Sequence, residues 1–364
     1  MSFTAPHRDL PEPPSSKTWP DLLDELLRGG HLNRATAHWA MRQIVRGEAT
    51  TTQIAGFLVA LRAKGETSAE ISGFVDALHE SATPVVIPGP TVDIAGTGGD
   101  GTGAINVSTM AAIVAAAAGI TVVKHGGRSA SSLTSGAADL AEHLGIPLDN
   151  KASAAAATAA KAGVTFLYAP HFNAGLRHAI DARRGLGIPT VFNTLGPLIN
   201  PANPHHRVIG AADRRVAPLI AEVLADRGHT GLVVRGRDGL DKLTTTESSD
   251  VWVVREGRVS TVELDPVVLS LPRAEPGDIR GGTAAENAAA FHALLAGQMG
   301  PIRDVVLLNA AAVAATMTLT DDPLEEQIGE ALPRCAEAID SGAAGKVLRC
   351  LVARDDDWYG TGRP

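Results

Sequence analysis

A glycine-rich segment at residues 93–101, DIAGTGGDG, lies at the end of a short apolar run that has the pattern of a strand. Glycines at the end of a parallel strand let backbone N–H groups converge on phosphate oxygens, and a helix that begins just beyond them adds its dipole. We expect that helix to open at residues 106–109, NVST, whose short polar side chains would meet a phosphate. The segment has neither a Walker GK[ST] ending nor a GxGxxG fingerprint, so a phosphate-binding loop and an ordinary tight turn both stay open.

A second loop, KHGGR at residues 124–128, ends another apolar run. A lysine and an arginine separated by glycines at the carboxyl edge of a sheet suit an anionic ligand. A solvated basic turn is the alternative. Because two such loops are expected to leave neighbouring strands, they favour a ligand with more than one phosphate.

A third loop, at residues 238–247, begins DGLDKLTTT and follows the apolar run TGLVVRG. Its aspartates could hold Mg²⁺, which prefers carboxylates together with substrate phosphates. Aspartates in loops more often form turns or cap helices. This loop alone therefore does not establish a metal site.

The elements that must position these loops begin with a helical N-terminal part. Apolar residues recur three and four apart within residues 22–27, 35–45, 51–63 and 69–82. Thr67 and Glu70 have the spacing of a capping box at the start of the fourth run. We predict a flexible tail at residues 1–18 and a small helical domain at 19–89, completed by a helical segment around residues 171–190.

Beyond Pro90 short apolar runs alternate with alanine-rich stretches of helical pattern. The runs that predict strands lie at residues 91–96, 120–127, 164–170, 189–193, 207–212, 230–236 and 304–311. The stretches that predict helices lie at residues 109–118, 151–161, 213–227 and from Gly282 onward. Residues 251–264 predict an antiparallel hairpin that turns at Glu256 and Gly257.

This alternation is typical of a mostly parallel sheet that helices cover on both faces. The predicted fold class is therefore α/β, with a small all-helical N-terminal domain and a large α/β domain at residues 90–364 built on a central, mostly parallel sheet.

Charge and composition exclude several classes of protein. The chain has 364 residues, with 40 acidic and 32 basic side chains and a net charge of −8, which argues against nucleic acid and anionic membranes as partners. Cys335 and Cys350 can form neither a disulfide scaffold nor a Cys/His zinc cluster. The N-terminus lacks the pattern of a signal peptide, and the longest apolar stretch, residues 110–123, is too short to span a bilayer. We expect a cytoplasmic protein.

Taken together, these segments resemble the anthranilate phosphoribosyltransferase family, from about Trp19 to the C-terminal helices. The motifs that carry the resemblance are GTGGDG at residues 96–101, NVST at 106–109, KHGGR at 124–128, RRGLGIPTVFNTLGPLINP at 183–201 and DGLDKLTTT at 238–246. The resemblance implies a nucleoside phosphorylase/phosphoribosyltransferase-like fold, in which a hinge joins a helical domain to an α/β domain and substrates bind in the cleft between them.

The resemblance also implies an activity. Enzymes of this family transfer the phosphoribosyl group of 5-phosphoribosyl-1-diphosphate (PRPP) to anthranilate in tryptophan biosynthesis and release pyrophosphate. It implies Mg²⁺ as a cofactor and a homodimer formed through the helical domain.

The family pattern assigns roles to individual residues of this chain. The residues implied to bind PRPP are Gly96, Thr97, Gly98, Gly99, Asp100, Asn106, Ser108, Thr109, Lys124, Ser131 and Ser132. A metal would be held by Ser108 and Asp241, and the acceptor would lie near Gly127, Pro170, Asn173 and Arg183. No residue is assigned as a catalytic group, because neutralising the departing pyrophosphate and orienting the acceptor are the main contributions.

Three places depart from the family pattern. Gly127 stands where the family has an asparagine, Asn173 and Ala174 replace a histidine and a proline, and Lys242 replaces an expected second acid. Lysine in place of an acid changes the local charge by two units, which should weaken or remove one Mg²⁺ site. Lys242 could instead contact the pyrophosphate itself. The donor half of the site matches the family, whereas the acceptor half is altered.

Three functions fit this pattern. The first is an anthranilate phosphoribosyltransferase. The second is a sister PRPP-dependent transferase of secondary metabolism, whose acceptor is an aminocyclitol or an aromatic hydroxyl or amine, as the loss of bulk at Gly127 and Ala174 would suit. The third is a non-catalytic PRPP-binding homologue disabled by Lys242. Turnover of anthranilate, turnover of another acceptor only, or PRPP binding without turnover would distinguish them.

Overall fold

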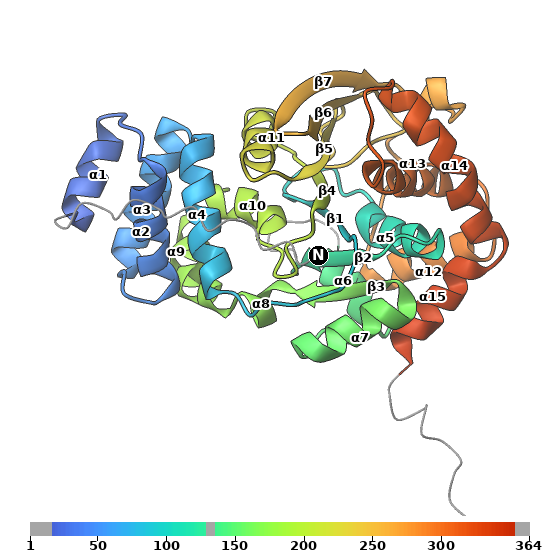
Figure 1. Cartoon of the computed structure of the whole chain (residues 1–364), viewed down its shortest axis with the longest axis horizontal. Coiled ribbons are helices and arrows are strands. Elements are labelled where there is room, and N and C mark those ends of the chain that lie inside the picture. The colour runs from blue at the N-terminus through green and yellow to red at the C-terminus, as the bar shows by residue number, and fades with distance from the viewer. Residues whose placement is uncertain (1–16, 129–134, 354–364) are drawn as a thin grey trace, which may run out of the picture. The chain divides into compact units, whose positions relative to one another are not determined.

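A computed structural model of the chain describes residues 17–128 and 135–353. The chain divides into two compact units (Figure 1). Met1–Ala82 and Asn173–Leu195 form the first, called the helical unit below, and Thr83–Phe172 and Gly196–Pro364 form the second, called the sheet unit. No helix in the described ranges combines the length and apolar character needed to cross a membrane.

The helical unit opens with four helices where the apolar periodicity predicts them. They are α1 (Trp19–Leu27), α2 (Arg34–Val45), α3 (Thr51–Lys64) and α4 (Ser68–Ser81). The capping box at α4 is confirmed, because the Glu70 N–H donates to Thr67 Oγ1 at 3.3 Å and the Thr67 N–H donates to Glu70 Oε2 at 2.9 Å. Trp19, Phe57 and Phe74 pack edge to face in the core of this unit.

The second stretch of the helical unit contains η1 (Ala174–Ala179), α9 (Ile180–Leu186) and α10 (Val191–Leu195). These pack on α2, α3 and α4 respectively. The strand predicted at residues 189–193 is wrong, because α10 begins there. Thr190 and Asn193 form a helix start, with the Thr190 N–H donating to Asn193 Oδ1 at 3.1 Å. This local capping and the burial of Val191 against the unit outweigh the β-branched composition of the run.

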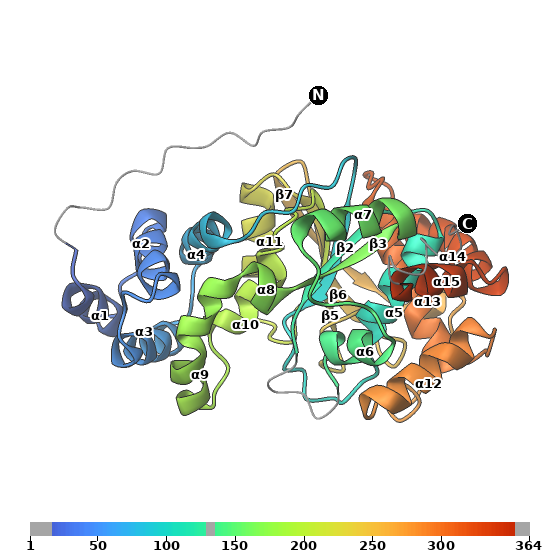
Figure 2. The ribbon, with the colours of Figure 1, turned by 90° about the horizontal axis from the view of Figure 1, so that it is seen from below.

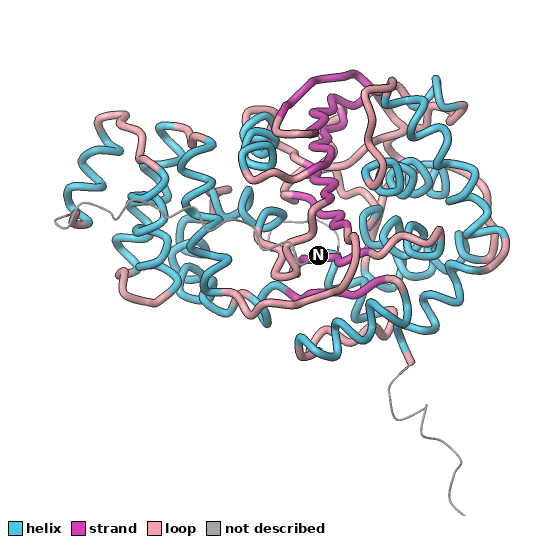
Figure 3. The backbone as a smooth tube through the Cα atoms, viewed as in Figure 1, coloured by secondary structure: helices cyan, strands magenta, loops and turns pink. Residues whose placement is uncertain are grey.

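The sheet unit is built on one seven-stranded sheet (Figure 3). Its strands are β1 (Val92–Gly96), β2 (Val122–Gly126), β3 (Val164–Tyr168), β4 (His206–Gly210), β5 (Thr230–Gly236), β6 (Ser249–Arg255) and β7 (Arg258–Leu264), in the order β3-β2-β1-β4-β5-β6-β7. The first five are parallel, and β6 and β7 are antiparallel. The predicted hairpin is confirmed, with its turn at Glu256 (φ 51°) and Gly257 (φ 72°).

Helices lie on both faces of this sheet. Because β2 and β5 lie on opposite sides of the β1–β4 pair, right-handed crossovers place α5 (Val107–Ala117) and α11 (Val216–Asp226) on opposite faces, as Figure 1 shows. The helix α13 (Pro301–Thr316) packs on α5 and on α14 (Leu324–Asp340), and α15 (Ala343–Val352) adds to this group (Figure 2). The remaining short elements are α6 (Ala137–His143), α7 (Ala152–Ala162), α8 (Ala169–Phe172), η2 (Gly196–Leu198), η3 (Pro266–Leu269) and α12 (Ala284–Leu295).

The strand predicted at residues 304–311 is also wrong, because these residues form the middle of α13. Val305, Val306, Leu308 and Ala310 are all buried, so the helix has no polar face in this stretch. An apolar run without alternation cannot be assigned to a buried helix or a buried strand by periodicity. Pro301 at the first turn is the start signal that marks the helix.

The order of the parallel strands identifies the edge where a ligand is expected. The chain proceeds from β1 to β2 and β3 in one direction and then returns to the other side of β1 with β4. In open parallel sheets, ligands bind at the carboxyl ends of the strands where the order reverses. The loops after β1 and β4 meet at this point.

Candidate active site

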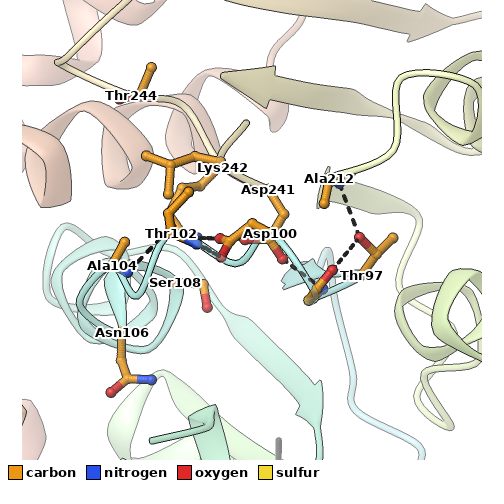
Figure 4. A network of polar contacts seen from close by, with 12 residues as sticks. Thr97, Asp100, Thr102, Ala104, Asn106, Ser108, Ala212, Asp241, Lys242 and Thr244 are labelled. Atoms are coloured by element: carbon orange, nitrogen blue, oxygen red, sulfur yellow. Dashed lines mark hydrogen bonds and ion pairs between the residues drawn. The ribbon is translucent and has the colours of Figure 1, made fainter. Parts of the chain in front are cut away.

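The loop after β1 is anchored to the loop after β4. The Thr97 N–H donates to the Gly210 carbonyl at 2.9 Å, and the Ala212 N–H donates to Thr97 Oγ1 at 3.1 Å (Figure 4). Gly98 and Gly99 then adopt φ values of 66° and 74°, a region that side chains other than glycine rarely enter. Within residues 17–128 and 135–353, the N–H groups of Gly99 and Asp100 have no protein acceptor. They are therefore available to an anion.

Glycines also allow the loop after β5 to approach β1 and β4. A Cβ on Gly96 would lie 2.2 Å from Asp241 Oδ2, and a Cβ on Gly210 would lie 1.5 Å from the Asp241 carbonyl oxygen. Both distances are shorter than any real contact of a Cβ atom. The three loops can therefore pack together only because these two positions carry no side chain.

A compact ionic cluster joins the loops after β1 and β5. The Lys242 ammonium donates to Asp241 Oδ1 at 2.5 Å and to Asp100 Oδ2 at 3.0 Å. The other oxygen of Asp241 accepts the Gly98 N–H at 2.8 Å. Figure 4 shows Asp100, Asp241 and Lys242 pointing toward one another. Burial opposes the charge of Asp100, but the Lys242 ammonium lowers the pKa of this carboxyl to about 2, so both partners stay ionised.

Lys124 lies on β2 beside the first turn of α5. Its ammonium is buried and donates to the Ile94 carbonyl at 2.7 Å and to Ser108 Oγ at 3.1 Å. Burial lowers the pKa of Lys124 to about 8, although the carboxylates of Asp93 and Asp241 act in the opposite direction. A bound anion would raise this pKa again, because a nearby negative charge favours the charged form of the ammonium that burial disfavours.

Asn106 is held by two residues that the sequence interpretation did not single out. Asn287 Nδ2 donates to Asn106 Oδ1 at 2.6 Å and to Ser135 Oγ at 3.0 Å, and the Ser135 hydroxyl donates to Asn106 Oδ1 at 2.9 Å. The Gly282 N–H donates to Asn287 Oδ1 at 2.8 Å. The start of α5 is thus fixed by the buried side chain of a distant helix, α12.

We predict that Asn287→Ala lowers the free energy of unfolding by about 2 kcal/mol, because the Gly282 N–H loses its acceptor and Asn106 loses a donor. We also expect the Kd for PRPP to rise about tenfold, since Asn106 then keeps its hydrogen bonds to Ser135 but loses the donor that ties it to α12. Urea denaturation and calorimetric titration with PRPP measure the two effects.

The matched control is Asn33→Ala, which removes the cap of α2 in the helical unit, where Asn33 Oδ1 accepts the Thr36 N–H at 2.8 Å. It should lower stability by about 1 kcal/mol without changing PRPP affinity. An unchanged Kd in Asn287→Ala would show that Asn287 has no part in positioning Asn106.

The remaining residues predicted near the phosphates have surroundings that differ from those of Lys124 and Asn106. Thr109 is buried in α5, and its hydroxyl has no hydrogen-bond partner in the described parts of the chain. Ser131 and Ser132 lie outside the described residues. Arg128, in the KHGGR loop, pairs with Asp139 at 2.7 Å and Glu142 at 2.8 Å, and these carboxylates raise the pKa of its guanidinium. Arg128 is therefore already neutralised by α6.

The predicted acceptor residues are distributed over both units. Gly127 and Pro170 belong to the sheet unit, and Asn173 and Arg183 belong to the helical unit. Asn173 is buried, at 1% exposure. The Arg183 guanidinium lies over the ring of Phe192, 5.3 Å from its centroid, and burial lowers the pKa of Arg183. Their roles toward an acceptor stay predictions.

The residues around Asp241 do not fit a site for a divalent metal ion, because their carboxylate oxygens already accept hydrogen bonds. One oxygen of Asp241 is taken by Lys242 and the other by the Gly98 N–H, and both oxygens of Asp100 accept from Lys242 or Thr102. Among the described residues there is no group of three or more His, Cys, Asp or Glu side chains arranged to hold a metal. Ser108 Oγ, at the first turn of α5, keeps a lone pair available beside Lys124.

Comparisons with known proteins agree with this arrangement of loops and helices. Residues 88–345 match the glycosyl transferase family a/b domain, and residues 20–82 match the helical bundle domain of the same family. The chain is 51% identical over 336 residues to the anthranilate phosphoribosyltransferase of Salinispora arenicola. The aligned region covers 91% of this chain and 95% of that relative.

Solved structures agree as well. The anthranilate phosphoribosyltransferase of Thermus thermophilus is similar with a TM-score of 0.83 and 37% identity, covering 92% of this chain and 100% of that one. The enzyme of Saccharomyces cerevisiae in complex with PRPP and Mg is similar with a TM-score of 0.82 and 29% identity, covering 92% of this chain and 97% of that one. The chain belongs to the anthranilate phosphoribosyltransferase family.

Proposed function

We propose that this pentosyltransferase moves the 5-phosphoribosyl group of PRPP to the amine of anthranilate and releases pyrophosphate, a step of tryptophan biosynthesis. The observation that carries the proposal is a group at the reversal point of the sheet. It consists of Lys124, the start of α5, and the N–H groups of Gly99 and Asp100, which have no acceptor in the described parts of the chain. Backbone donors, a helix N-terminus and a lysine together suit a diphosphate. Similarity to the yeast enzyme in complex with PRPP and Mg supports the same assignment.

In the proposed reaction, the amine nitrogen of anthranilate forms a bond to ribose C1 while the bond from C1 to the pyrophosphate oxygen breaks. The electron pair of the broken bond leaves with pyrophosphate, and the amine then loses a proton to water. Lys124 and the N–H groups of Gly99 and Asp100 stabilise the charge that develops on the leaving group. The phosphates and ribose would also contact Thr97, Asn106 and Ser108.

We propose that Ser108, rather than Asp241, would hold a Mg²⁺ ion bound together with the diphosphate. When bound, Mg²⁺ supplies positive charge that offsets the charge on the leaving pyrophosphate. The hydroxyl of Ser108 would supply one oxygen ligand, and waters and substrate phosphates would supply most of the others.

We propose that Arg183 binds the carboxylate of anthranilate through its planar guanidinium. Arg183→Gln is then expected to raise KM for anthranilate about thirtyfold while the Kd for PRPP stays unchanged. Arg183→Lys should rescue little of the loss, because an ammonium cannot make the paired hydrogen bonds of a guanidinium. Steady-state kinetics at saturating PRPP measures the effect, and an unchanged KM would remove Arg183 from the acceptor site.

The test of the proposed function is incubation of the protein with PRPP, Mg²⁺ and anthranilate, followed by loss of anthranilate fluorescence. Loss of fluorescence that requires PRPP, with one pyrophosphate released per anthranilate consumed, supports the proposal. Absence of turnover, with turnover of an aminocyclitol or another aromatic amine or hydroxyl in its place, would replace anthranilate by that acceptor.

We further propose a cytoplasmic homodimer that pairs through a helical domain of residues 19–89, completed by residues 171–190, with residues 90–364 as the α/β domain. Leu27 on α1 and Val59 on α3 are apolar and exposed, at 77% and 42%, and we propose that pairing covers them. Light scattering after size exclusion should give twice the chain mass of 37.6 kDa, and a mass equal to one chain would contradict the dimer.

A further inference from the structure

Lys242 closes a ring of contacts around the loop after β1. Its ammonium joins Asp100 and Asp241 (Figure 4). Asp241 also accepts the N–H of Gly98, so the ring contains the backbone of Gly99. Asp100 and Lys242 are 142 residues apart in the chain. The Lys242 side chain is only 13% exposed. A cation is thus bound to the loop that carries the N–H groups of Gly99 and Asp100, which have no protein acceptor among the described residues.

Hydrogen bonds to α13 and within the loop fix the backbone that follows Lys242. The buried amide of Asn309, on α13, accepts the Leu243 N–H at 3.2 Å and donates to the Leu243 carbonyl at 2.9 Å. The Thr244 hydroxyl donates to Asp238 Oδ2 at 2.6 Å. Because the backbone on the C-terminal side of Lys242 is fixed, its ammonium is held at the carboxylates rather than free in solvent.

Lys242 sets the net charge of this cluster. One ammonium between two carboxylates leaves a net charge of minus one. With glutamate at this position the net charge would be minus three, and one divalent ion would return it to minus one. An ammonium donates up to three hydrogen bonds, and two of them are assigned to Asp100 and Asp241. Among the described residues the third has no acceptor, so an anionic ligand could accept it.

We propose that Lys242 is the resident cation of this site, occupying the place between Asp100 and Asp241 that a divalent ion would otherwise fill, so that the protein binds PRPP with one Mg²⁺ fewer than a variant with an acid there. Lys242 also keeps the loop of residues 96–101 in its binding conformation before any ligand arrives. The first part concerns the protein alone. The part about PRPP rests on the proposed function.

The first experiment needs no substrate. Thermal unfolding of the wild-type protein should not change when millimolar Mg²⁺ is added, whereas the midpoint of Lys242→Glu should rise by about 5 °C because the ion binds only the folded cluster. The matched control is Arg237→Glu, since Arg237 also lies between two carboxylates, Asp250 at 3.0 Å and Glu263 at 2.8 Å, but at an exposed edge of β5 to β7. It should show little change with Mg²⁺.

The second experiment measures the Kd for PRPP by calorimetry as the concentration of free Mg²⁺ is varied. Kd should fall as free Mg²⁺ rises, and the slope of log Kd against log free Mg²⁺ should be more negative in Lys242→Glu than in wild type by about one unit. This difference corresponds to one additional ion bound with PRPP, and Arg237→Glu should have the wild-type slope. Equal slopes for wild type and Lys242→Glu, or a wild-type midpoint that rises with Mg²⁺ as much as that of the variant, would overturn the inference.

Lys242→Gln keeps the test decisive if Lys242→Glu does not fold. It should raise the Kd for PRPP at least about tenfold at low Mg²⁺, and added Mg²⁺ should narrow the difference from wild type. A Kd equal to that of wild type at all Mg²⁺ concentrations would overturn the inference. Failure of the wild-type protein to bind PRPP would contradict the proposed function instead, and the thermal experiment would still decide the role of Lys242.

Discussion

Replacing Lys124 with methionine is expected to lower kcat/KM for PRPP about a thousandfold, which corresponds to about 4 kcal/mol of lost stabilisation. The methionine keeps most of the volume of the side chain but removes the buried ammonium that bonds Ile94 and Ser108. The leaving pyrophosphate would then lose a fixed positive charge inside the protein. Steady-state kinetics with PRPP as the varied substrate measures the effect.

The same lysine predicts a pH dependence. Because burial lowers the pKa of Lys124 to about 8, the free protein loses this charge as pH rises through about 8. kcat/KM for PRPP should therefore decrease above that pH, since this ratio reports the ionisation of the free enzyme. Lys124→Met should lack that decrease.

A buried lysine elsewhere provides the control for Lys124→Met. Lys64, with a side chain 3% exposed, pairs with Glu70 at 3.0 Å in the helical unit. Lys64→Met should lower the free energy of unfolding but leave kcat/KM for PRPP and its pH profile unchanged. If Lys124→Met behaved like Lys64→Met, Lys124 would be a structural residue only.

Replacing Gly210 with alanine is expected to lower the free energy of unfolding by about 3 kcal/mol. The added Cβ would lie 1.5 Å from the carbonyl oxygen of Asp241, and a backbone atom cannot move aside as the end of a flexible side chain can. The loop after β5 must therefore shift away from β4. Since Lys242 follows Asp241 directly, PRPP affinity should fall with stability, and denaturant titration and calorimetry measure the two.

The control for Gly210→Ala is Gly277→Ala, because a Cβ at Gly277 would meet no atom within 4 Å. It should change the free energy of unfolding by less than about 0.5 kcal/mol. A Gly210→Ala protein as stable as Gly277→Ala would mean that the two loops do not pack as described.

Much of the fold follows from local patterns in the sequence. The four N-terminal helices, the capping box at Thr67 and the hairpin at Glu256 and Gly257 are confirmed, because each depends on residues close together in the chain. The mostly parallel sheet is confirmed as well. The strands predicted at residues 189–193 and 304–311 are wrong for two different reasons. The first run forms a helix start that Asn193 caps, whereas the second is buried almost throughout and carries no periodicity to separate helix from strand.

The site could be predicted only in part. Glycines after a strand and a nearby lysine predict an anion loop, since these signals are local. The contact of Asn106 with Asn287 joins residues 181 positions apart, and no spacing rule indicates it. Likewise, the sequence shows Lys242 beside Asp241, but the bond from Lys242 to Asp100 depends on how the loops after β1 and β5 meet.

The most direct test of the central claim, that this edge of the sheet binds the diphosphate of PRPP, is a calorimetric comparison of PRPP with ribose 5-phosphate at one Mg²⁺ concentration. The two ligands share the ribose and the 5-phosphate and differ in the diphosphate. We predict that PRPP binds at least about a hundredfold more tightly, a difference of about 3 kcal/mol, and that Lys124→Met removes most of this difference. Equal affinities of the wild-type protein for the two ligands would contradict the account.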